Sequence, residues 1–314
     1  MSIEGRKAGV VLAGAALCAR RHHLLWILYG LNLLLAAWGT VPLLLALRRV
    51  LDHSLAADGL YKRLDANALA ELLSRPHLSL SAYAPASFLF SLLFAALMLF
   101  LSGGILETYR CGRALSPGEF FAACGTFLGR FVRMAILLGL VLLGLGAAGA
   151  GFHGWSSAAV GRSGREMLGF WLLAGEAVLL GLLCLVARIW FDIAQARVVA
   201  ENEPRVLPAL ASGFSLTFRH LGRLFWLYLQ IILVACAGLC LLFWCWLKLV
   251  RPERVGLSFL LTQAALLLWL GARLWQRASS MLWYQAVSAT RVIRAPEAAA
   301  PPPSPGPLAE AQAE

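Results

Sequence analysis

The sequence predicts an all-α protein, a polytopic transmembrane helical bundle with about six spans plus short interfacial amphipathic helices. Of its 314 residues, 60% are hydrophobic and only 14% are charged, against about 25% charged in ordinary soluble domains. Six apolar runs reach the roughly 20 residues that a helix needs to cross the hydrocarbon core. Because lipid offers the backbone no hydrogen bonds, these runs are expected to be helices.

The chain is expected to have three parts. Residues 1–23 form a cytoplasmic or interfacial helix, because the apolar run at residues 8–18 is too short to cross a membrane; a cleaved signal peptide is the alternative. Residues 24–294 form the transmembrane domain. Residues 295–314 contain six prolines and are predicted to be disordered. The six predicted spans are approximately residues 24–47, 86–106, 131–152, 167–187, 224–247 and 256–272.

Two segments between the spans are typical of amphipathic helices that lie in the plane of a membrane. In the first, residues 116–130, Ser116 is a candidate N-cap and Glu119 stands where a capping box needs its carboxylate. This helix is expected to lie among the lipid headgroups and then to turn into the third span. The second segment is residues 204–222. The outer loop, residues 48–85, carries leucines at helical spacing and is expected to hold one or two short surface helices.

The two interfacial segments can be aligned with each other. The alignment places Gly125 over Gly213, and upstream it sets Glu107 against Asp192. The chain can therefore be read as two loosely repeated units of span, acidic residue, interfacial helix and span. Coincidence between short segments is the other reading.

The basic residues predict an orientation and a lipid partner. With the N-terminus inside, the flanks on the inner side carry 17 Lys and Arg and those on the outer side carry 10, so both termini are expected in the cytoplasm. The net charge of +11 comes from short collars of arginine at the ends of apolar runs. Such collars favour binding to the bilayer and its anionic headgroups, not to nucleic acid.

Three stretches carry a resemblance to known proteins: LYGLNLLLAAWGTVPLLLALRRVLDHSLAA at residues 28–57, GGILETY at 103–109 and FDIAQARVVAENEPRVLPALASGFSLTFRH at 191–220. In these stretches the chain resembles a group of uncharacterised six-span bacterial membrane proteins. It is also distantly similar to the membrane domain that accompanies glycerophosphodiester phosphodiesterases. The resemblance implies a six-span topology and a bacterial inner membrane, and it implies no activity.

Glu176 is the ionisable side chain placed deepest in a predicted span. A charge at the middle of the bilayer costs about 2.5 to 3.5 kcal/mol on insertion scales. One reading is a proton or cation site. The other is a neutral carboxyl that is hydrogen-bonded to Asn32, Gln230 or Gln263, the polar groups of other spans.

A second candidate site is a charge network on the cytoplasmic side. Arg188 and Asp192 are four residues apart and share a helix face. Glu107, Arg273 and Arg277 leave their spans at a similar depth, so the five side chains are expected to meet. The network reads as a gate or an anionic headgroup site, or else as ordinary anchoring and helix pairing.

Small residues four apart mark the third span as a helix that packs closely against another. The pairs are Ala135 and Gly139, Gly144 and Ala148, and Gly146 and Ala150.

The sequence contains no pattern typical of an enzyme. Its seven cysteines and six histidines form no spaced ligand set, and neither a phosphate-binding loop nor a nucleophile with a base is evident. No cofactor, metal or catalytic residue is predicted. The expected role is a non-enzymatic envelope scaffold or accessory subunit, with a membrane protein partner or as a homo-oligomer. The alternative is a small transporter or lipid-handling permease that uses Glu176 and the charge network.

Overall fold

The computed structural model describes residues 3–51, 80–163, 166–250 and 255–294. Within these ranges every regular element is an α-helix, and six helices are long and apolar enough to cross a membrane, which confirms the predicted fold class. Most of the outer loop and the C-terminal tail lie outside the described residues. The helices are α1 (Ile3–Arg20), α2 (His22–Leu51), α5 (Leu80–Cys111), α6 (Pro117–Ser163), α7 (Glu166–Ala200), α8 (Val206–Arg219), α9 (Leu221–Leu249) and α10 (Val255–Arg294).

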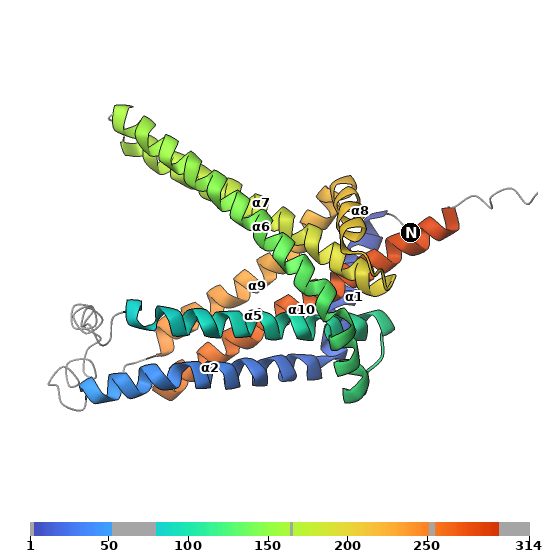
Figure 1. The fold of residues 1–314 in the computed structure, drawn as a ribbon, viewed down its shortest axis with the longest axis horizontal. Coiled ribbons are helices and arrows are strands. Elements are labelled where there is room, and N and C mark those ends of the chain that lie inside the picture. The colour runs from blue at the N-terminus through green and yellow to red at the C-terminus, as the bar shows by residue number, and fades with distance from the viewer. Residues whose placement is uncertain (1–2, 52–79, 164–165, 251–254, 295–314) are drawn as a thin grey trace, which may run out of the picture.

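The helices are packed at one end of the molecule and open at the other. The N-terminal helix α1, the short helix α8 and the C-terminal part of α10 gather on the right in Figure 1. All buried apolar side chains of the described chain fall in residues 11–28, 101–134, 187–235 and 270–284. We call these four stretches the packed end.

Outside the packed end the helices present large apolar side chains to their surroundings. Leu143 of α6 and Phe170 of α7 are typical, and both are exposed. The outer parts of α6 and α7 lie side by side and diverge from α2, α5, α9 and α10, forming an arm (Figure 1). Because acyl chains are as apolar as these side chains, helices gain little by closing such a gap in lipid. We call residues 136–163 and 166–186 the α6–α7 arm.

The first amphipathic segment is not a separate interfacial helix, so the predicted division between residues 116–130 and the third span is wrong. Both belong to α6, a single helix of 47 residues with a length of about 70 Å at about 1.5 Å per residue. After Pro117 no proline interrupts it. Its apolar stripe continues across the predicted boundary and is buried, in the residues Phe120, Cys124, Phe127, Phe131 and Met134.

The stripe of α6 packs against α5, where it was expected to face lipid. Two adjacent glycines of α5 make the approach possible. A Cβ atom on Gly103 would lie 3.2 Å from the Cβ of Phe127, and one on Gly104 would lie 2.7 Å from the Sγ of Cys124. The absence of side chains at these positions therefore allows close contact between the two helices.

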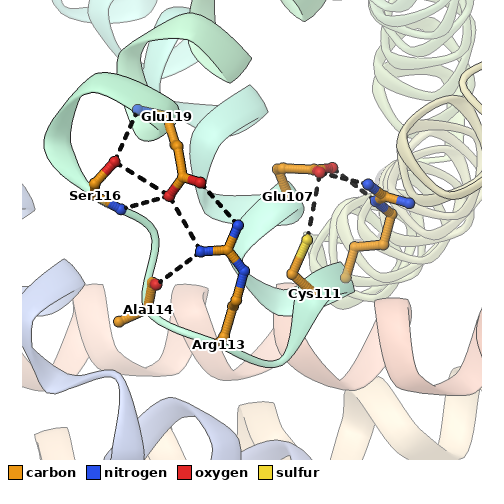
Figure 2. Close-up of polar contacts among 7 residues, drawn as sticks. Glu107, Cys111, Arg113, Ala114, Ser116 and Glu119 are labelled. Carbon is orange, nitrogen blue, oxygen red and sulfur yellow. Dashed lines mark hydrogen bonds and ion pairs between the residues drawn. The ribbon is translucent and has the colours of Figure 1, made fainter.

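The start of α6 carries the predicted capping box. The Ser116 backbone N–H donates to Glu119 Oε2 at 2.8 Å, and the Glu119 N–H donates to Ser116 Oγ at 3.3 Å. Arg113 adds an ion pair to Glu119 at 2.8 Å (Figure 2). These bonds satisfy amide groups that have no partner in the first turn of the helix.

The second amphipathic segment does form its own helix, α8, within the predicted residues 204–222. It packs on α7, where a Cβ atom on Gly213 would lie 3.1 Å from the Cβ of Ala194. The aligned glycine, Gly125, would place its Cβ atom in open space. The two glycines therefore do not play equivalent roles in packing.

The N-terminal helix α1 docks along the second half of α10. The Trp275 indole N–H donates to the carbonyl of Val11 at 2.8 Å. A Cβ atom on Gly14 would lie only 2.2 Å from Ser279 Oγ. One face of α1 is thus covered by protein, and its predicted location at a membrane surface stays a prediction.

Candidate functional site

Four residues of the predicted charge network meet where α7 and α10 pack together. Arg188 and Asp192 lie one turn apart on α7, with Arg188 Nε 3.8 Å from Asp192 Oδ2. Arg273 and Arg277 lie one turn apart on α10, and both are within electrostatic reach of Arg188 and Asp192. We call these four residues the arginine cluster.

The fifth predicted member, Glu107, does not join them. Its carboxylate is paired with Arg110 at 2.5 Å and accepts a bond from the Cys111 thiol at 3.4 Å (Figure 2). Arg110 lies three residues along the same helix, and such neighbours meet on a helix surface without help from another element. The local pair therefore takes the carboxylate that was assigned to the network.

Polar residues not singled out from the sequence complete the arginine cluster. Arg188 Nη2 donates to Gln276 Oε1 at 2.7 Å, and the Tyr228 hydroxyl donates to Asp192 Oδ2 at 2.9 Å. Gln276 is only 6% exposed and Tyr228 is fully buried. The place of Gln276 directly before Arg277 in the sequence could have indicated that it belongs with the arginines. Nothing in the sequence around Tyr228 indicated a contact with Asp192.

Tyr109 forms the buried edge of the arginine cluster, within electrostatic reach of Arg277. Its side chain is buried. The hydroxyl lies beside the thiol of Cys18 on α1. Burial raises the pKa of that thiol, so it stays protonated at neutral pH.

The arginine cluster carries an excess of positive charge, because three guanidinium groups share one carboxylate. The other carboxylates whose side chains the structure describes bind elsewhere: Glu107 to Arg110, Glu119 to Arg113, Glu176 to His153, Glu201 to Arg197 and Tyr284, and Glu203 to the Arg205 backbone N–H. Removing unpaired charge from water is costly. The cluster is therefore suited to an anion supplied from outside the described chain.

Glu176 does not meet the polar groups of the other spans. Asn32 donates to the Leu28 carbonyl of its own helix at 2.7 Å, and Gln263 accepts a bond from Tyr29 at 3.1 Å. Gln230 is half-buried on α9. The proposed set of Glu176 with these three residues is wrong, because the α6–α7 arm that carries Glu176 diverges from α2, α9 and α10 (Figure 1).

The partner of Glu176 is His153 of α6, which the sequence analysis had not connected with it. Glu176 Oε2 lies 3.3 Å from His153 Nδ1, and the side chains are 10% and 58% exposed respectively. The pair joins two helices, so no regular spacing along the sequence could reveal it. It holds the two helices of the arm together near the open end.

We expect Glu176→Gln to fold as the wild type does, because an amide can accept or donate in the same bond to His153. His153→Ala should lower the free energy of unfolding by about 1 to 3 kcal/mol, since it leaves a poorly solvated carboxyl without a partner. Thermal unfolding in detergent measures both effects. The double variant should be more stable than His153→Ala alone; equal stability would show that the pair does not hold the arm.

Within the described residues, no group of three or more His, Cys, Asp or Glu side chains is arranged to hold a metal ion. No family model matches the chain, and neither the curated proteins nor the solved structures yield a match. The resemblance to six-span bacterial proteins and to the phosphodiesterase-associated membrane domain stays a prediction.

Proposed function

We propose that the chain is a non-enzymatic scaffold or accessory subunit of a bacterial inner membrane, with both termini in the cytoplasm. The packed end then lies on the cytoplasmic side, and the α6–α7 arm reaches across the bilayer. What supports a role in assembly is the open face of α6 within this arm.

The small residues of α6 were predicted to pack closely against another helix. Gly144 and Ala148, one turn apart on one side of α6, are both exposed, and a Cβ atom on Gly144 would meet nothing within 4 Å. Gly149, on another side of α6 from Gly144, is used within the chain, since its Cβ position lies 2.7 Å from Leu180 of α7. Small residues four apart let helix backbones approach in lipid, and such faces pair with their like. The occupant that fits is α6 of a second copy.

Gly144→Leu is expected to abolish this self-association without unfolding the chain. The new side chain enters the open face and keeps two α6 helices apart. Cross-linking in native membranes and the mass of the complex in detergent measure the effect.

Gly175→Leu provides the matched control, because Gly175 on α7 is also exposed with nothing within 4 Å of its Cβ position. Its neighbours four residues away are Trp171 and Leu179, so it belongs to no small-residue face. A monomeric wild type, or equal loss of association in both variants, would contradict the proposal.

Orientation can be tested at the tip of the arm. A reporter fused after Ser163 is expected on the outer side of the membrane, because the inner flanks carry more Lys and Arg than the outer ones. Paired phosphatase and fluorescent-protein fusions report the side directly. A cytoplasmic signal from that fusion would reject the proposed orientation.

The alternative permease would need Glu176 on a polar path shared with other spans. Its observed neighbour is His153, on the adjacent helix of the same arm. This contact favours a structural role for Glu176, so the scaffold is the function we propose.

A further inference from the structure

The arginine cluster has donors on two helices, α7 and α10, which the bond from Arg188 to Gln276 joins. The side chain of Arg188 is 36% exposed, so a ligand from solvent or lipid can reach it. Arg273 is exposed, and Arg277 is half-buried one turn further along α10. Guanidinium groups bind phosphate through pairs of parallel N–H bonds, which makes clustered arginines a suitable surface for phosphate oxygens.

The neighbouring side chains fix this arrangement. Gln276 accepts the bond from Arg188, and Tyr228 donates to Asp192. Asp192 can therefore orient Arg188, but one carboxylate cannot balance three guanidinium groups. Two positive charges remain for an external partner.

The exposed apolar side chains that precede the arginine cluster on both helices suggest its depth in a bilayer. On α7 the last exposed large apolar side chain before the cluster is Leu183, and on α10 it is Trp269. The arginines begin within one or two turns of both. The guanidinium of Arg273 also lies over the Trp269 ring, 5.6 Å from its centroid, and tryptophan is enriched where acyl chains give way to headgroups.

We propose that Arg188, Arg273 and Arg277 form a binding site for a phosphate-bearing anion, either an anionic lipid headgroup or free phosphate. The site is independent of the small-residue face of α6, since it lies in the packed end. Variants of the arginine cluster should therefore leave self-association unchanged.

Thermal unfolding of the purified full chain in a neutral maltoside detergent tests the proposal. The probes are short-chain phosphatidylglycerol, inorganic phosphate, and chloride at the same ionic strength. We expect a saturable rise in melting temperature with at least one phosphate probe beyond the effect of chloride. A response to phosphatidylglycerol alone assigns a lipid headgroup, and a comparable response to inorganic phosphate assigns the free anion.

The double variant Arg273→Gln with Arg277→Gln should weaken the apparent affinity by about tenfold or more, because each change removes a charge-assisted bond. Arg219→Gln with Arg223→Gln is the matched control: both side chains are exposed, and the loss of charge is the same. This control should bind as the wild type does.

Asp192→Asn tests the site in the opposite direction. The amide oxygen can still accept the bond from Tyr228, while the competing negative charge is gone. We expect the apparent affinity for the phosphate probe to rise. Three results would overturn the proposal: a wild type that responds no more to phosphate probes than to chloride, a control double variant that binds as weakly as the cluster variant, or an Asp192→Asn variant without tighter binding.

Discussion

Gly104→Ala is expected to lower the free energy of unfolding by about 1 to 3 kcal/mol, the usual cost of overpacking a core. The added Cβ would lie 2.6 Å from Cε2 of Phe120 and 2.7 Å from Sγ of Cys124. Alanine is the better helix former by about 1 kcal/mol, so a net loss means that the clash between α5 and α6 dominates. Chemical or thermal unfolding in detergent measures the difference.

Gly125→Ala on α6 is the matched control. Its Cβ would meet nothing within 4 Å, so only the gain in helix propensity remains, and the variant should be as stable as the wild type or more so. Cys124→Ala should restore part of the stability lost in Gly104→Ala, because it removes the clashing Sγ atom and leaves only the Phe120 ring. If Gly104→Ala and Gly125→Ala behaved alike, the close approach of α5 and α6 would be wrong.

Gly14→Ala is expected to detach α1 from α10 in part and to destabilise the chain by about 2 kcal/mol. The new Cβ would lie 2.2 Å from Oγ and 3.1 Å from Cα of Ser279. The second distance involves backbone, so a change of rotamer at Ser279 cannot relieve the clash. Protease sensitivity of α1, measured beside thermal unfolding, should increase with the loss of stability.

Gly9→Ala lies on the same helix and would meet nothing within 4 Å, so it should leave both measurements unchanged. Ser279→Gly should rescue Gly14→Ala in part, with a coupling energy of about 0.5 to 3 kcal/mol, as expected for residues in contact. Additive effects of the two changes would contradict the observed packing of α1 on α10.

Local signals predicted the features that depend on neighbouring residues. The length of the apolar runs predicted six spans, and Ser116 with Glu119 predicted the capping box. Arg188 and Asp192, four residues apart, were correctly paired. Each of these depends on one helix or one turn, where spacing along the chain determines geometry.

The contacts between helices could not be predicted in the same way. In a membrane protein a stripe such as Phe120, Phe127 and Phe131 looks the same whether it faces lipid or protein, because both environments are apolar. For that reason the stripe was assigned to the membrane surface and found buried. The adjacent Gly103 and Gly104 were the signal that a second helix approaches.

The site was predicted only in part for a related reason. The predicted charge network was correct for Arg273 and Arg277. These long side chains leave α10 at the level where Arg188 and Asp192 leave α7. The assignment failed where a nearer partner was present on the same helix, as with Glu107, or on an adjacent helix, as with Glu176. To choose among such partners one must know the angles between the helices, and the spacing of residues along the sequence does not determine those angles.

The packed end and the lipid-exposed helices outside it are subject to different evolutionary constraints. In the packed end a side chain must fit a neighbour of fixed shape, so one added or lost methyl group is felt. Outside the packed end, where the helices face lipid, any apolar side chain of suitable length is tolerated, because fluid acyl chains adjust to its shape. Substitutions should therefore accumulate quickly between about residues 136 and 186, apart from the small residues of α6 and the His153 and Glu176 pair. Among sequences that descend from this chain, the positions that change least should therefore be those of the packed end.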